Sequence, residues 1–133
     1  IKQSKLIAVP GCYATSVILG LYPLRYHHYK IQSVHVDAKS GVSGAGKKVQ
    51  DSYLFTELNE IMGAYLTANH RHQAEFIEQL DMPIVFSPHL IPVNRGILSS
   101  MYVMFHNEID YDYISKQLPS NCFAGYDGLI VRV

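Results

Sequence analysis

Cys12 is the residue best placed for chemistry, because it follows a chain-reversing Pro-Gly pair at positions 10–11. Apolar residues between Val17 and Leu24 recur at the three-to-four spacing of a buried helix face, so a helix is predicted to start beside this cysteine. The unpaired N–H groups at a helix N-terminus favour a thiolate, which is a nucleophile near neutral pH. A buried structural cysteine is the competing interpretation and fits the local sequence about as well.

A second group of chemistry-bearing residues is His70, Arg71 and His72, directly before a predicted helix. Cations are poorly placed there, because the helix macrodipole is positive at its N-terminus. Residues that break such a local rule often mark a functional site. Two histidines around one residue suit a metal, but no third ligand follows at a recognisable distance. Acid/base chemistry is therefore favoured over metal binding, and no metal is expected.

The stretch from Ser40 to Lys48 contains three glycines and two serines beside two lysines. Such a loop can turn several backbone N–H groups inward as an anion nest. The order of its glycines does not match the dinucleotide fingerprint, and no Walker-type lysine-serine pair follows, so this loop alone binds no nucleotide. A flexible surface loop is the alternative, and it is favoured for a glycine-rich loop considered by itself.

Composition predicts one globular domain over residues 1–133 with no charge-driven partner. The chain is 48% hydrophobic, and its eleven Lys and Arg balance eleven Asp and Glu, which argues against nucleic acid or an anionic membrane as a partner. No apolar run reaches the length of a membrane span and no signal-peptide pattern opens the chain, so we expect a cytoplasmic protein. Cys12 and Cys122 match no metal spacing, and a reducing compartment disfavours a bridge between them.

The elements that must position these residues are short strands and helices. Strands are predicted over 5–9, 31–39, 82–90, 97–105 and 129–133. Helices are predicted from Tyr13 onward, after His72 with an apolar stripe of Phe76, Ile77 and Leu80, and from an Asp110 cap to Leu118. Residues 51–65 are interpreted as irregular with a helical turn, and 122–128 as a loop. Strands 82–90 and 97–105 form a hairpin-like or crossover pair in a largely antiparallel sheet.

Four motifs follow one another along the chain. They are Pro10-Gly11-Cys12-Tyr13-Ala14-Thr15, Ser40-Gly41-Val42-Ser43-Gly44-Ala45-Gly46, His70-Arg71-His72 with Glu75, and Pro88-His89-Leu90 followed by Pro92 and Arg95-Gly96. In this order they resemble the N-acetyl-gamma-glutamyl-phosphate reductase family. The departures at Gln73-Ala74 and at Ala14 touch no charged or nucleophilic position.

The resemblance implies NADPH-dependent reduction of N-acetyl-glutamyl 5-phosphate to N-acetyl-glutamate 5-semialdehyde, a step of arginine biosynthesis. It implies that the Cys12 thiolate expels inorganic phosphate and forms a thioester. His72 is then the expected acid/base catalyst and His70 the runner-up. The substrate-binding residues are expected to be His70, Arg71 and Arg95, because guanidinium groups suit a carboxylate or phosphate. Ser43 and Gly44 are expected to line the nicotinamide side of NADP.

The resemblance also implies an α+β fold with a mixed, mostly antiparallel sheet and helices on one face, like the C-terminal domain of glyceraldehyde-3-phosphate dehydrogenase-type enzymes. It covers only the catalytic and dimerisation domain of a two-domain enzyme, whose Rossmann domain holds most of the NADP. We therefore expect the 133 residues alone to lack reductase activity. The free sheet face forms the subunit contact in this family, which predicts a homodimer or homotetramer.

Two other functions stay open. One is a related reductase, acting on N-acetyl-aminoadipyl phosphate or as an aspartate-semialdehyde dehydrogenase, because the motifs do not measure substrate length. The other is a non-catalytic oligomerisation module. Cys12, His72 and Arg95 favour an enzyme, because a module that only associates needs none of them.

Overall fold

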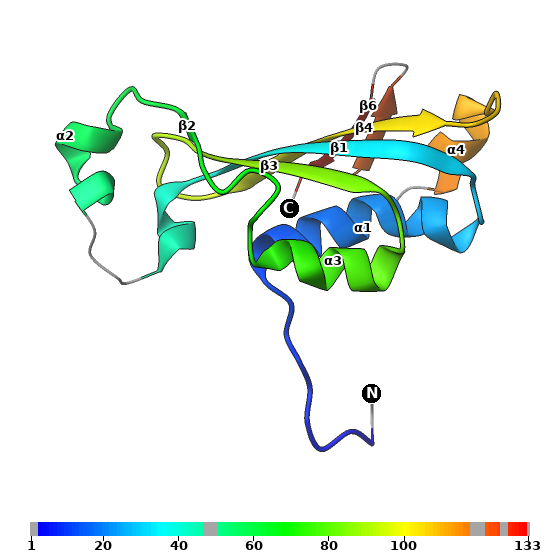
Figure 1. The fold of residues 1–133 in the computed structure, drawn as a ribbon, viewed down its shortest axis with the longest axis horizontal. Coiled ribbons are helices and arrows are strands. Elements are labelled where there is room, and N and C mark those ends of the chain that lie inside the picture. Colours follow the sequence, from blue (N-terminus) through cyan, green and yellow to red (C-terminus); the bar gives the residue numbers. More distant parts are fainter. Residues whose placement is uncertain (1–2, 47–50, 118–121, 126–127, 133) are drawn as a thin grey trace.

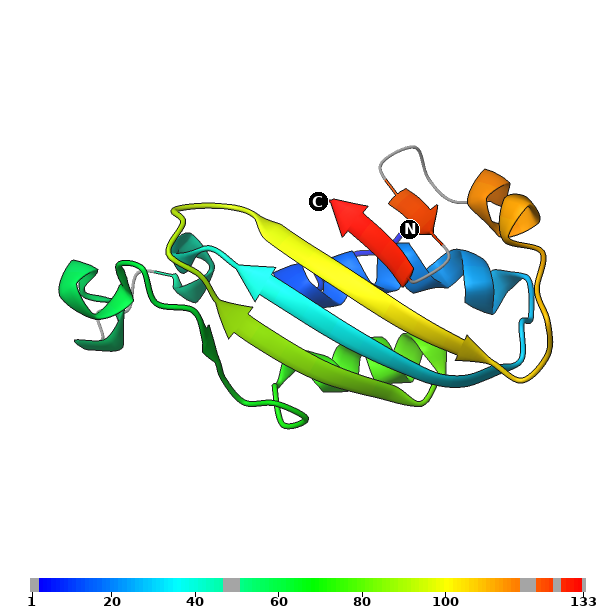
Figure 2. The ribbon, with the colours of Figure 1, turned by 90° about the horizontal axis from the view of Figure 1, so that it is seen from above.

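The computed structural model describes residues 3–46, 51–117, 122–125 and 128–132, and it centres on a six-stranded mixed sheet (Figures 1 and 2). The strands are β1 (Ile31–Ser40), β2 (Gly63–Ala64), β3 (Ile84–Leu90), β4 (Ile97–Phe105), β5 (Cys122–Gly125) and β6 (Gly128–Arg132), in the order β2-β3-β1-β4-β6-β5. Only β1 and β3 run parallel, and the other neighbours are antiparallel. The predicted mixed, mostly antiparallel sheet is confirmed.

Two helices, α1 (Cys12–Tyr26) and α3 (His72–Leu80), lie side by side against one face of this sheet (Figure 1). The shorter helices are α2 (Phe55–Leu58), α4 (Tyr111–Gln117) and the 3₁₀ turns η1 (Val42–Ala45) and η2 (Asp51–Tyr53). The predicted cap of α4 is present, because the Asp110 carboxylate accepts the Tyr113 N–H at 3.0 Å. The predicted end of this helix at Leu118 lies outside the described residues.

The core forms where alternate residues of β1 meet the two helices. Val34, Val36 and Ala38 are buried on the helix-covered face, and the residues between them point to the free face. On α3 the buried stripe is His72, Phe76 and Leu80, at a spacing of four residues. Burial of each large apolar side chain stabilises the fold by about 1.5–3 kcal/mol. Because His72 lies on the same face of α3 as Phe76 and Leu80, its side chain also points toward the interior.

Three predictions about elements are corrected. Residues 5–9 form no strand, since they pair with no strand of the sheet and extend away from it, leaving Leu6 91% exposed (Figure 1). Ile77 does not join the buried stripe, because one residue after Phe76 is turned by about 100° around the helix axis. Residues 122–125 form β5 rather than a loop, because they pair with β6.

Strands β3 and β4 form the crossover that was one of the two predicted arrangements. They lie on opposite sides of β1 and do not pair with each other. The connection between them, residues 91–96, therefore crosses the carboxyl end of β1. This crossing places the turn before β4 against the glycine-rich loop that follows β1.

Candidate active site

Cys12 is the first residue of α1 and its side chain is exposed. The Gly11 carbonyl closes the first turn by accepting the Thr15 N–H at 2.8 Å and the Thr15 hydroxyl at 3.0 Å. Helix geometry leaves the first N–H groups of α1 without intrahelical acceptors, and the first turn holds no acidic residue. The helix-start prediction is confirmed, and the interpretation of Cys12 as a buried structural cysteine is wrong.

The His72 imidazole lies directly against the Cα of Gly11. A Cβ added to Gly11 would stand 2.4 Å from His72 Nε2, so only glycine permits this approach. His72 is 9% exposed, and its Nδ1 has no hydrogen-bond partner among the described residues. The structure thus brings the predicted acid/base residue next to the peptide that leads into Cys12.

Glu75 joins the two helix starts, because its Oε2 accepts the Gly11 N–H at 2.8 Å. Burial lowers the pKa of His72 below its ordinary value of 6.5, while the Glu75 carboxylate raises this pKa and Arg71 lowers it. The net shift is downward, so His72 is held neutral and able to accept a proton. Sequence reasoning quoted Glu75 only as part of a motif, although its spacing of three residues from His72 places both on one helix face.

His70 lies beside His72, with 4.7 Å between ring centroids. Its Nδ1 accepts the His72 backbone N–H at 3.2 Å, and its ring meets those of Tyr13, Tyr65 and Phe86 edge-on at 5.5–5.6 Å. Burial lowers the pKa of His70, and His72 and Arg71 lower it further. The structure therefore places both predicted histidines in one aromatic cluster as neutral imidazoles.

Two tyrosines in this cluster were missed by sequence reasoning. The Tyr13 hydroxyl donates to the His89 carbonyl at 3.0 Å, and the Tyr65 hydroxyl donates to the Tyr13 hydroxyl at 3.3 Å. Burial raises the pKa of Tyr13, so this phenol stays neutral. Tyr13 directly follows Cys12, and this adjacency could have marked it as a residue of the site. No local feature of the sequence marks Tyr65.

The glycine-rich loop is held by the turn before β4. The N–H groups of Gly41, Val42 and Ser43 donate to the carbonyls of Gly96, Val93 and Asn94 at 2.9–3.0 Å. Those of Gly44 and Gly46 donate within the loop at 3.2 Å. The anion nest that these glycines permit does not form in the described residues, because carbonyls already occupy the N–H groups that it requires.

Ser43, Gly44 and Arg95 are exposed and lie on the two segments that pair here. Arg71 is exposed at the start of α3, beside the histidines. The structure thus divides the predicted site into a histidine group at α1 and α3 and a loop group after β1. The Ser40 hydroxyl lies between the two groups. On the histidine side it lowers the pKa of Tyr13, against the larger effect of burial, which raises this pKa. On the loop side it packs against Gly44, since a Cβ added to Gly44 would stand 2.8 Å from the Ser40 oxygen.

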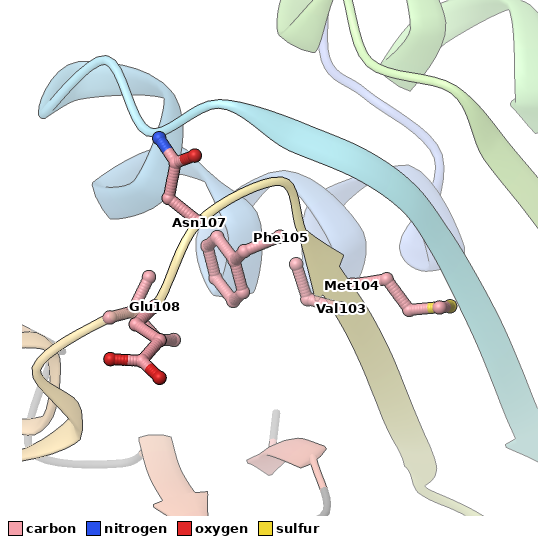
Figure 3. Close-up of a pocket in the computed structure, with 6 residues that line it drawn as sticks. Val103, Met104, Phe105, Asn107 and Glu108 are labelled. Atoms are coloured by element: carbon pink, nitrogen blue, oxygen red, sulfur yellow. The ribbon is translucent and has the colours of Figure 1, made fainter.

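Other parts of the described chain do not extend this site. The shallow hollow in Figure 3 is lined by Val103, Met104, Phe105, Asn107, Glu108 and Ile109. It sits where β4 ends, opposite the start of β1, so it lies at the far end of the sheet from Ser40. Within the described residues no three His, Cys, Asp or Glu side chains are arranged so that they could hold a metal ion. None of the described helices is long and apolar enough to cross a membrane.

Known proteins resemble this chain across nearly all of the described residues. Residues 12–124 match the family model described as semialdehyde dehydrogenase, dimerisation domain. The chain is 47% identical over 109 residues to the N-acetyl-gamma-glutamyl-phosphate reductase of Alkaliphilus metalliredigens, a match that covers 77% of this chain and 32% of that relative. The chain spans about a third of the length of the curated relatives it matches.

Solved structures share the fold at low sequence identity. A probable aspartate-semialdehyde dehydrogenase from Pseudomonas aeruginosa aligns with a TM-score of 0.70 at 12% identity, over 96% of this chain and 57% of that one. An aspartate semialdehyde dehydrogenase from Candida albicans, solved with NADP, aligns with a TM-score of 0.59 at 15% identity, over 86% and 35%. These alignments confirm the predicted α+β fold class.

Proposed function

This chain belongs to the semialdehyde dehydrogenase family, and from that membership we propose that it is the catalytic and dimerisation domain of a two-domain N-acetyl-gamma-glutamyl-phosphate reductase. The reaction is the NADPH-dependent reduction of N-acetyl-glutamyl 5-phosphate to the 5-semialdehyde, in arginine biosynthesis in the cytoplasm. The observation that carries the proposal is that a buried imidazole, His72, packs against Gly11, the residue directly before the exposed Cys12 at the start of α1.

Cys12 is the nucleophile in this proposal. Its sulfur attacks the acyl carbon, a C–S bond forms, and the C–O bond to phosphate breaks with release of inorganic phosphate. The exposed position of Cys12 allows substrate to reach the sulfur. The first-turn N–H groups of α1 stabilise the charge that develops on the acyl oxygen, because they are the positive end of the helix.

His72 moves the protons. Its lowered pKa leaves Nε2 free to take the thiol proton from Cys12 at neutral pH. The resulting imidazolium then protonates the oxygen of the thiohemiacetal after reduction, and the neutral ring takes that proton back as the C–S bond breaks and the aldehyde leaves. Glu75 supports the charged form of this imidazole, because the carboxylate raises its pKa.

NADPH supplies the hydride that reduces the thioester. The exposed Ser43 hydroxyl and the bare Cα of Gly44 fit one side of a nicotinamide ring. The loop has few free N–H groups to offer, because those of Gly41 to Gly44 are already bonded. The loop therefore supplies only part of the NADP-binding site. This supports the proposal that a second domain holds most of the NADP and that these residues alone have no reductase activity.

Arg71 and Arg95 hold the substrate anions in this proposal. Both arginines are exposed, and neither makes an ion pair within the described residues. The free sheet face forms the subunit contact of a homodimer or homotetramer, because it presents exposed apolar side chains such as Tyr102 and Met104. The dimerisation-domain match supports this assembly.

The test is Cys12→Ala in the full-length protein, assayed with N-acetyl-glutamate semialdehyde, phosphate and NADP, beside Cys122→Ala. We expect Cys12→Ala to lose essentially all turnover and Cys122→Ala to keep it. Aspartate semialdehyde and N-acetyl-aminoadipate semialdehyde are assayed in parallel, because one methylene changes specificity by only about 1–3 kcal/mol. Wild-type protein that self-associates but turns over none of the three would instead indicate the oligomerisation module.

A further inference from the structure

Helix α3 starts without the usual kind of cap. Arg71, in the cap position, has helical dihedral angles of φ −53° and ψ −34° and makes no side-chain cap hydrogen bond. His70, the preceding residue, caps the helix instead. Its carbonyl oxygen accepts the Gln73 N–H at 2.8 Å, and its side-chain Nδ1 accepts the His72 N–H at 3.2 Å. A side-chain acceptor that reaches the N–H two residues later is the pattern of an Asx turn, made here by an imidazole.

This hydrogen bond fixes the protonation of His70. An Nδ1 that accepts must carry no proton, so the ring is neutral with its proton on Nε2. The rings of Tyr13, Tyr65, Phe86 and His72 surround it, and it is 9% exposed. Protonation at Nδ1 would set two N–H groups against each other in a buried place.

The charged and titratable groups around His70 favour the neutral ring. Burial lowers the pKa of His70, His72 and Arg71 at the start of α3 lower it further, and only Glu75 raises it. Tyr13 on α1 and Tyr65, which follows β2, pack against the ring. Both are neutral, because burial raises the pKa of each. The residue packed from β3, Phe86, does not titrate.

We propose that His70 is a positioning residue, whose neutral Nδ1 caps α3 and thereby holds the His72 ring against Gly11. The inference rests on the proposed function, in which His72 moves the proton. It differs from an acid/base or substrate-binding role, because the atom at work is Nδ1 and its partner is a backbone N–H. In this arrangement the two histidines divide the work, since one sets the geometry and the other titrates.

A pair of substitutions in the full-length protein separates these roles. The Oδ1 of Asn occupies the place of Nδ1, so His70→Asn keeps the cap and loses Nε2. The side-chain amide of Gln reaches the place of Nε2, so His70→Gln loses the cap. We expect His70→Asn to keep kcat within about tenfold of wild type, and His70→Gln to lose about 100-fold, because a misplaced catalytic group costs about that much.

The pH profile and NMR supply further readouts. In His70→Asn the acidic limb of kcat should remain, since His72 produces it, whereas loss of that limb would assign the titration to His70. Selective ¹⁵N-histidine NMR of wild-type protein should show an unprotonated Nδ1 at His70. This measurement needs no turnover, so it tests the cap even if the proposed reaction is wrong. A protonated Nδ1, equal loss of activity in both variants, equal retention in both, or an active His70→Gln beside an inactive His70→Asn would overturn the proposal.

Discussion

The start of helices α1 and α3 and the glycine-rich loop after β1 are held in place by different kinds of contact. At the helix starts, long-range side-chain contacts fix the parts, since Glu75 bonds to the Gly11 N–H and His72 packs on the Gly11 Cα. At the loop, backbone N–H groups pair with backbone carbonyls while Ser43 and Gly44 remain exposed. Under the proposed function, this difference means that the proton-transfer geometry is built within this domain, whereas the proposed cofactor side presents an open surface.

Among the substitutions that test this comparison, the largest effect is expected for Gly11→Ala in the full-length protein. The new Cβ would stand 2.4 Å from His72 Nε2, so the imidazole must move away from the peptide before Cys12. We expect kcat to fall about 100-fold, the cost of misplacing a catalytic group. Steady-state kinetics measures this effect. Gly63→Ala is the matched control, because nothing lies within 4 Å of its added Cβ, and equal losses in both would contradict a specific Gly11–His72 contact.

Glu75→Gln tests the charge at the helix starts without removing the acceptor of the Gly11 N–H. Because the carboxylate raises the pKa of His72, its loss should lower that pKa further and move the acidic limb of the kcat profile to lower pH. We expect about a tenfold loss of kcat as His72 becomes a weaker base. Glu78→Gln, on the exposed side of the same helix, should leave the profile in place. An unmoved limb in Glu75→Gln would contradict this role.

Gly41→Ala probes the second region. Its Cβ would meet the Val93 carbonyl at 2.8 Å and the Arg95 N–H nitrogen at 2.9 Å, so the loop must separate from the turn. We expect the KM for NADP to rise about tenfold, which corresponds to about 1.4 kcal/mol of binding free energy, while the acidic limb set by His72 stays. A shift of that limb with an unchanged KM would show that the two regions are not independent.

The smallest effect is a dependence of stability on pH. The pKa of both His70 and His72 is lowered in the folded state from an ordinary value of 6.5, so the unfolded chain binds more protons below about pH 6.5. The free energy of unfolding should therefore fall as pH decreases from that value, as measured by denaturant titration of the isolated chain. His70→Asn should weaken this dependence, whereas His106→Gln, at an exposed position, should not. The same slope in all three proteins would rule out the buried histidines as its source.

Local pattern was sufficient to predict the elements that position the candidate site residues. The spacing from Val17 to Leu24 and the Pro-Gly pair before Cys12 located the start of α1, and period-two alternation located β1. Tertiary pairing decided what the sequence could not. The bond between Gly11 and Glu75 joins residues 64 positions apart, and no local propensity encodes it.

Tertiary pairing also explains why the anion nest does not form. Glycines at 41, 44 and 46 permit a nest, but the carbonyls that occupy their loop's N–H groups come largely from residues 93–96, about fifty positions later. The strand over 5–9 failed because apolar composition does not supply a pairing partner. Residues 122–125 form β5 only because they pair with β6. The sequence predicted the strand over 129–133 but gave no sign that residues 122–125 pair with it.

Trapping the covalent intermediate tests the proposed role of Cys12 most directly. The full-length protein is mixed with N-acetyl-glutamyl 5-phosphate in the absence of NADPH, quenched in acid and analysed by peptide mass spectrometry. We predict an N-acetyl-glutamyl thioester on Cys12, released by hydroxylamine, and much slower formation of this thioester in His72→Asn, because the thiol then lacks its base. Acylation of Cys122 instead, or phosphate release with no adduct on Cys12, would contradict this role.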